Sequence, residues 1–107
     1  MLDMSRVVGF DWDNGNARKN VDKHDVSRSE SEQIFFNEPL LLLSDVKHSQ
    51  KEVSYHALGT SEAGRLLHVT FTLRFDHTLI RVISARDMHW KEEKIYGQIQ
   101  ENTKLRQ

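Results

Sequence analysis

Apolar and polar residues alternate most regularly between positions 67 and 75. Every second residue there is apolar, and the set comprises Leu67, Val69, Phe71, Leu73 and Phe75. Because successive side chains of a strand point to opposite faces, the pattern predicts a strand with one buried and one solvated face. A turn at residues 76–77 leads into a second strand over residues 78–86, in which Ile80 and Val82 are expected to oppose Leu79, Ile83 and Ala85. The two segments predict an antiparallel hairpin.

Three further strands are expected earlier in the chain. Residues 7–12 are β-branched and aromatic, and turn-forming residues 13–16 follow them. The unbroken apolar run at residues 40–43 favours a strand covered on both faces. Residues 52–59 alternate again, with Val53, Tyr55 and Ala57 on one face.

Three helices are expected between and after these strands. The first covers residues 17–24, where apolar positions recur at helical spacing. The second begins at Ser27, which forms a capping-box pattern with Glu30, and it ends near Asn37 because Pro39 disfavours helix before it. The third begins after Asp87 as N-cap, with Met88, Ile95 and Ile99 on one stripe. Residues 98–107 are expected to fray.

This order predicts an α+β fold, in which an antiparallel sheet of about five strands packs with two N-terminal helices and one C-terminal helix. The chain has 107 residues, of which 37% are hydrophobic, so one domain over residues 1–107 is expected. No apolar run has the length of about 18 residues that a membrane span needs, and the first residues lack the order of a signal peptide, which favours the cytoplasm. The absence of cysteine excludes disulfides and thiolate metal sites.

The net charge of −1 argues against a uniformly basic surface, yet positive charge is concentrated in one stretch of the chain. Four arginines lie on or beside the last two strands: Arg65, Arg74, Arg81 and Arg86. Guanidinium groups beside His68 on the solvated face would suit the phosphates of an RNA strand. The alternative is that these arginines form ion pairs with acidic residues such as Glu52, Glu92 and Glu93.

Lys23 and His24 join a fixed cation to an imidazole that titrates near neutral pH, a combination suited to proton transfer at a phosphate ester. The alternative for His24 is a buried structural role. No pair of histidines has the spacing of a helical or finger-type metal site, although His56 and His68 could meet across paired strands. We therefore expect no metal, and the absence of nucleotide-binding motifs gives no reason to expect a cofactor. Trp90 lies off the apolar stripe and is expected to be exposed.

Six blocks of the sequence together resemble the BrnT family of toxins. They occur in the family's order between about residues 9 and 97, nearly the whole chain. The blocks are Phe10-Asp11-Trp12-Asp13, Ala17-Arg18 with Asn20, Lys23-His24 with Val26-Ser27, Phe35-Phe36 with Pro39, Gly64-Arg65-Leu66-Leu67 and Arg81-Val82-Ile83-Ser84-Ala85-Arg86. Glu92 and Tyr96 then fall at the family's last acidic and aromatic positions.

The resemblance implies a RelE-like fold and a metal-independent ribonuclease that stops translation in a bacterial cell. It also implies a BrnA-type antitoxin that masks the toxin and forms with it a DNA-binding repressor, so DNA contact is expected only through the antitoxin. Catalytic groups are then expected among Lys23, His24, Glu52, Arg65 and Arg86. RNA-binding groups are expected among His68, Arg74, Arg81 and Tyr96. Proton transfer at the 2′-hydroxyl is left open among Lys23, His24 and Glu52.

The chain departs from the family pattern near the expected site. Asn16 and Val53 stand where the family has basic residues, Arg28 stands at an aromatic position, and Asp25 replaces glycine. Loss of positive charge weakens phosphate binding. A second hypothesis is therefore a catalytically weak or inactive member that acts as a partner-binding co-repressor of its operon.

Overall fold

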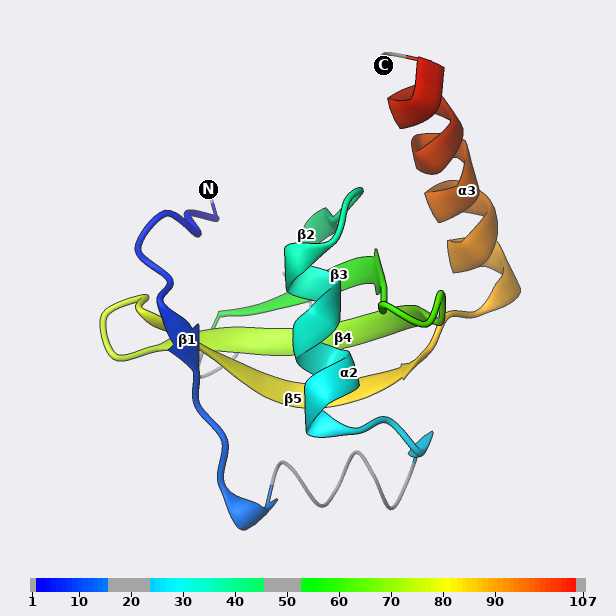
Figure 1. Cartoon of the computed structure of the whole chain (residues 1–107). Coiled ribbons are helices and arrows are strands. Elements are labelled where there is room, and N and C mark those ends of the chain that lie inside the picture. Colours follow the sequence, from blue (N-terminus) through cyan, green and yellow to red (C-terminus); the bar gives the residue numbers. More distant parts are fainter. Residues whose placement is uncertain (1, 16–23, 46–52, 106–107) are drawn as a thin grey trace.

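In the computed structural model, which describes residues 2–15, 24–45 and 53–105, five strands form one sheet. Their order across the sheet is β1-β5-β4-β3-β2 (Figure 1). The strands are β1 (Gly9–Phe10), β2 (Leu41–Asp45), β3 (Ser54–Thr60), β4 (Leu66–Arg74) and β5 (Leu79–Asp87). The expected α+β class is therefore confirmed.

The sheet is mixed, and the expectation of a purely antiparallel sheet was wrong. Strands β2 to β5 pair antiparallel in sequence order, as expected for a meander. The short β1, however, runs parallel to β5, with Gly9 opposite Leu79 and Phe10 opposite Ile80. The first strand therefore lies beside the last one, with β2 at the opposite edge of the sheet. No short turn connects β1 to its partner β5, so β1 does not belong to a hairpin.

Two helical segments follow Ser27 and cover one face of the sheet. They are α2 (Arg28–Gln33), which lies across the strands in Figure 1, and the 3-10 turn η1 (Ile34–Phe36). The capping box is confirmed: Glu30 N donates to Ser27 Oγ at 3.1 Å, and Ser27 N lies 3.5 Å from Glu30 Oε1. The helical segment ends at Asn37, before Pro39, as expected. The first helix, expected at residues 17–24, lies almost entirely outside the described residues.

The alternation in β4 correctly predicts the core, except at Phe75, which lies beyond the end of the strand and is 68% exposed. Leu67, Val69 and Phe71 are fully buried beneath α2 and η1, together with Ile34 of η1. A register shift between Thr70 and Phe71 changes the pattern in β5. It inserts one residue, Ile83, so that Ala85 joins Ile80 and Val82 in the core and Ile83 remains 40% exposed. The bulge explains why strict alternation placed Ala85 on the wrong face.

The run at residues 40–43 forms a strand, but not a central one. It gives β2, which lies at an edge of the sheet, and Leu43 is 49% exposed. Coverage on both faces was therefore a wrong expectation.

The last helix, α3 (Trp90–Leu105), projects from one end of the sheet (Figure 1). It begins later than expected, because Asp87 is the last residue of β5 and not an N-cap. Tyr96 anchors the helix in a small cluster with Leu58 and Met88, whereas Ile95 is 51% exposed. The helix continues to Leu105, so most of the segment expected to fray is helical. Among the described residues, no helix is long and apolar enough to cross a membrane.

Candidate functional site

The sheet face opposite α2 is polar along β3, β4 and β5. The register places His56 beside Thr70, His68 beside Arg86, and Thr72 beside Arg81. Because alternate residues share a face, the expected RNA-binding residues His68, Arg74 and Arg81 lie on this one face. The expected catalytic residue Arg86 lies there too. Thr72 on this face is buried, with its hydroxyl donating to Val53 O at 2.7 Å.

A cluster of four polar side chains lies where this face meets the start of α3. His68 Nε2 lies 2.9 Å from His56 Nδ1, and His68 Nδ1 lies 2.7 Å from Glu92 Oε2. Arg86 donates to both carboxylate oxygens of Glu92, through Nη1 at 2.9 Å and Nη2 at 3.2 Å. We call these residues, His56, His68, Arg86 and Glu92, the histidine cluster.

Hydrogen-bond chemistry favours one tautomer of His68 in this cluster. The pKa of Glu92 is about 2: burial acts to raise it, but hydrogen bonds from Arg86, His89 N and His68 outweigh that effect. His68 Nδ1 lies 2.7 Å from Glu92 Oε2, which only accepts hydrogen bonds, and 2.8 Å from Arg86 Nη2, which only donates them. Because Arg86 Nη2 also donates to Glu92 Oε2, at 3.2 Å, we assign the proton of His68 Nδ1 to the bond with Glu92. His68 Nε2 is then an acceptor, and His56 Nδ1 donates to it. His56 Nδ1 also lies 3.0 Å from Thr70 Oγ1.

Burial also determines the charge of His68. Its side chain is only 12% exposed, and desolvation lowers its pKa below the ordinary value. Glu92 acts in the opposite direction, whereas Arg86 and His56 lower the pKa further. His68 is therefore neutral at neutral pH and has a lone pair on Nε2 that can accept a proton.

Arg65, an expected catalytic residue, lies at the opposite face and binds protein groups with its whole guanidinium. Nε and Nη2 donate to Asp87 Oδ1 and Oδ2 at 2.7 and 3.2 Å. Nη1 donates to Glu30 Oε1 at 3.1 Å and to the carbonyl of Asp25 at 2.8 Å. Nη2 also lies 3.3 Å from the carbonyl of His24. These bonds raise the pKa of Arg65 and give it the geometry of a structural clamp.

His24, a second catalytic candidate among the described residues, lies beside Arg65, which donates to its backbone carbonyl. It also lies near Asp87. Its charge contributes to the lowered pKa of Asp87, after the larger effect of the Arg65 hydrogen bond. Cross-strand pairing puts Asp87 beside Leu67 on the core face and Arg86 beside His68 on the polar face. The structure thus separates His24 and Arg65 from His68 and Arg86. Lys23 and Glu52 lie outside the described residues.

The remaining expected RNA-binding residues have different surroundings. Arg81 donates to Asp13 Oδ2 at 2.8 Å and to Asp11 Oδ2 at 3.4 Å, near the end of β1. Arg74 is half-buried at the end of β4. Tyr96 is fully buried, and its hydroxyl donates to Pro39 O at 2.6 Å and accepts from Thr60 Oγ1 at 2.9 Å. In this structure Tyr96 is a core residue and is not accessible to RNA.

The structure adds His56 to the candidate site, a residue that the sequence suggested only as a cross-strand neighbour of His68. In the sequence, His56 could be recognised only as a residue on the polar side of an alternating strand. The pairing of β3 with β4 is what shows that it lies next to His68. Trp90 is 69% exposed, as expected, at the start of α3. Among the described residues, no group of three histidine or acidic side chains has an arrangement that could hold a metal ion.

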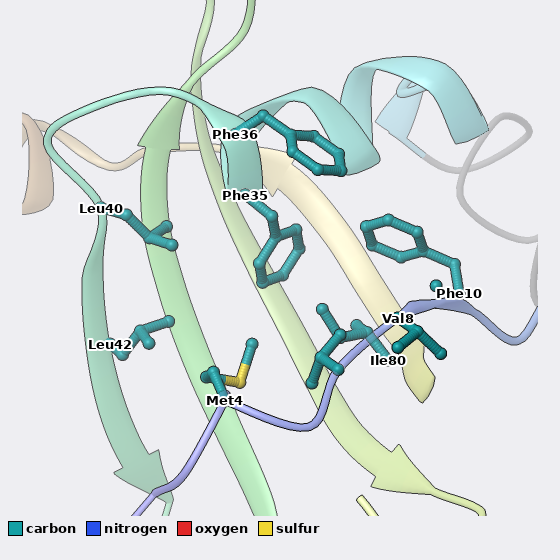
Figure 2. Close-up of a pocket in the computed structure, with 10 residues that line it drawn as sticks. Met4, Val8, Phe10, Phe35, Phe36, Leu40, Leu42 and Ile80 are labelled. Carbon is teal, nitrogen blue, oxygen red and sulfur yellow. The ribbon is translucent and has the colours of Figure 1, made fainter. Parts of the chain in front are cut away.

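An apolar pocket of about 330 Å³ opens on the other face of the sheet. Figure 2 shows it between the N-terminal segment, η1 and β2. The rings of Phe10 and Phe35 are in edge contact there, with their centroids 5.7 Å apart. It is lined by Met4, Val7, Val8, Gly9, Phe10, Phe35, Phe36, Leu40, Leu42 and Ile80. Its side chains have no group for acid–base chemistry, so the pocket is not a candidate catalytic centre.

Comparison with known proteins gives one family. No curated protein matches the chain significantly. Residues 12–92 match the family described as ribonuclease toxin, BrnT, of type II toxin–antitoxin system. The match includes β2 to β5, α2 and all four residues of the histidine cluster. The chain therefore belongs to the BrnT family of ribonuclease toxins of type II toxin–antitoxin systems.

Proposed function

We propose that this toxin cleaves RNA without a metal ion, at the histidine cluster on the polar face of the sheet. The observation that carries the proposal is the 2.9 Å contact between His56 and His68, next to the guanidinium of Arg86. Metal-free cleavage requires a base for the 2′-hydroxyl, a cation to balance charge on the phosphate, and a proton for the leaving 5′-oxygen. The cluster has groups for each requirement.

The two imidazoles can act as one proton relay. His56 takes the 2′-hydroxyl proton at Nε2 and passes its Nδ1 proton to His68 Nε2. The 2′-oxygen then attacks phosphorus, and the bond from phosphorus to the 5′-oxygen breaks. Return of the proton through His56 to that 5′-oxygen gives a 2′,3′-cyclic phosphate and a 5′-hydroxyl. Arg86 offsets the negative charge of the phosphate during this step.

Flanking phosphates would lie along the same face. Arg81 is five residues before Arg86 in β5, a separation of about 15 Å along a strand. Contacts over that distance involve different nucleotides, so Arg81 and Arg74 are proposed to position the strand and Arg86 to act at the scissile phosphate. A single RNA strand that lies along this face is the substrate we propose, and its cleavage would stop translation in the bacterial cytoplasm.

The test is cleavage of a defined RNA by the purified toxin in excess EDTA. We expect products with 2′,3′-cyclic phosphate ends from the wild type, and a loss of at least about 100-fold in rate for His56→Ala. His77→Ala is the matched control, because His77 is exposed at the β4–β5 turn. Intact RNA with the wild type, a requirement for a divalent metal, or equal rates for the two variants would contradict the proposal.

The antitoxin is proposed to be a BrnA-type protein encoded beside this chain, whose binding also creates a DNA-binding repressor. Membership of a type II family supports a partner of this kind. Co-expression of the neighbouring reading frame should yield a complex that contains both chains and restores growth. A neighbouring product that neither co-purifies nor restores growth would exclude it as the antitoxin.

A second candidate function is a catalytically weak co-repressor. It is favoured by the ion pairs of Arg65, Arg81 and Arg86, each of which has an acidic partner within 3.0 Å. Phosphate must compete with these carboxylates. Under this alternative, expression without antitoxin leaves growth and translation unchanged, while the complex with antitoxin still binds operator DNA.

A further inference from the structure

Glu92 has an unusually complete set of hydrogen-bond donors for a surface carboxylate. Oε1 accepts from Arg86 Nη1 at 2.9 Å and from the backbone of His89 at 3.0 Å. Oε2 accepts from His68 Nδ1 at 2.7 Å and from Arg86 Nη2 at 3.2 Å. Each oxygen thus has two donors, and the side chain is only 21% exposed. The donors form a nearly closed anion-binding site.

The same donors suit a phosphate group. A guanidinium fork binds two oxygens of a phosphate as it binds those of a carboxylate. An imidazole N–H and a backbone N–H at the start of the 16-residue helix α3 add further donors, and the helix dipole favours negative charge there. The site also lies beside His56, because His68 contacts both Glu92 and His56.

We propose that Glu92 occupies the binding site of the RNA phosphate and leaves it when substrate binds. This inference rests on the proposed function, since it identifies the phosphodiester as the ligand that replaces the carboxylate. In the substrate complex, Arg86 and His68 Nδ1 donate to phosphate oxygens and the Glu92 side chain turns toward solvent. The resting toxin is therefore inhibited by its own side chain.

A purely structural role explains only part of this geometry. Glu92 is the third residue of α3, and its bond to His89 N is the usual reach of a third-position glutamate back to the residue before the helix. That bond needs one oxygen. The bonds to His68 and Arg86 are not required for capping, and they occupy two groups that the proposed reaction uses.

The experiment compares Glu92→Gln with Glu93→Gln, which removes the same charge from the exposed neighbouring position. Inorganic phosphate is titrated into each protein while the imidazole signals of His68 are followed by NMR. We expect phosphate to bind Glu92→Gln about tenfold more tightly than it binds the wild type or Glu93→Gln. Adding Arg86→Ala to Glu92→Gln should abolish this gain. Equal affinity of the two glutamine variants, or a gain that survives Arg86→Ala, would overturn the inference.

The wild type provides a measurement that does not depend on the stability of a variant. Saturation with a 2′-O-methyl oligonucleotide, which cannot be cleaved, should release Glu92 and raise its pKa from about 2 toward its ordinary value. A Glu92 pKa that stays near 2 in that complex would contradict the inference. Neither measurement requires cleavage, so a toxin that binds phosphate as expected but leaves RNA intact would refute the proposed function alone.

Discussion

Arg65 and Asp87 form a two-bonded ion pair that joins the start of β4 to the end of β5. Nε lies 2.7 Å from Oδ1, and Nη2 lies 3.2 Å from Oδ2. Through Nη1 the same guanidinium holds Glu30 of α2, so one side chain ties a helix to two strands. An arginine with these bonds stabilises the fold, whatever its family position implies for catalysis.

We predict that Arg65→Ala lowers stability by about 1 to 3 kcal/mol, because the change removes hydrogen bonds to two carboxylates and two backbone carbonyls. Thermal or urea unfolding of the purified protein measures the loss. Relief of toxicity by this variant would then reflect loss of folded protein. Its cleavage rate, corrected for the folded fraction, should remain within a few-fold of the wild type.

Arg6→Ala is the control for a surface ion pair. Arg6 binds Asp76 at 2.7 Å, but the two side chains are 54% and 80% exposed, so solvent screens the pair and we expect no measurable loss of stability. If Arg65→Ala were as stable as Arg6→Ala and had lost cleavage, Arg65 would be a catalytic residue after all.

The alternation of β4 and the capping box of α2 were predictable because each depends on residues close in sequence. The β-bulge that moves Ala85 into the core, the edge position of β2 and the parallel pairing of β1 were not. Each depends on partners far along the chain: Gly9, for example, pairs with Leu79. A short segment such as residues 7–12 contains no signal for which edge of a sheet it joins.

Two glycines provide opposite predictions for the same substitution. A Cβ on Gly59 in β3 would lie 2.8 Å from the Cβ of Ile34, so β3 and η1 would have to separate. Gly97 in α3 has open space around the added atom. Gly59→Ala should destabilise the fold by about 1 to 3 kcal/mol. Gly97→Ala should stabilise it by up to about 1 kcal/mol. Urea unfolding distinguishes the two, and a stabilised Gly59→Ala would show that η1 is not packed as described.

Tyr96→Phe separates a structural from an RNA-binding role. Loss of the hydroxyl removes the bonds with Pro39 and Thr60, and we expect a cost of about 1 to 2 kcal/mol. RNA affinity should be unchanged at temperatures where the variant is folded. Tyr55→Phe, in the other tyrosine of the chain, is the control for removal of a phenolic oxygen. A weaker RNA affinity without a change in stability would return Tyr96 to the binding surface.

The candidate site was only partly readable in the sequence. His68 and Arg86 were identified by their positions on polar sides of strands, and one alternative for Arg86, an ion pair with Glu92, is confirmed. His56 became a specific candidate only through the β3–β4 register. The acids that bind Arg65 and Arg81 were not identified, because Asp87, Asp11 and Asp13 reach them through the tertiary fold.

Acid sensitivity should report the histidine cluster directly. The folded pKa of Glu92, about 2, lies below its ordinary value of 4.5, so the unfolded chain binds more protons between these values. The stabilisation from Glu92 is complete above about pH 4.5 and is lost as pH falls toward 2. The pKa of His68 is also lowered, chiefly by burial, so the unfolded chain binds this proton more readily than the folded protein does. Its contribution to stability is therefore complete above about pH 6.5, the ordinary pKa, and decreases as the pH falls below that value.

We therefore expect Glu92→Gln to be less stable than the wild type by about 2 kcal/mol at pH 6. Because the variant lacks the titrating group, the difference should shrink to a small fraction near pH 2, where about half of the wild-type Glu92 carboxyl is protonated. Urea unfolding of both proteins across this range measures it, with Glu93→Gln as the control that should match the wild type at each pH. A difference that stays constant with pH would mean that Glu92 stabilises the fold through packing. The carboxylate would then not be the anion that Arg86 and His68 bind in the resting toxin.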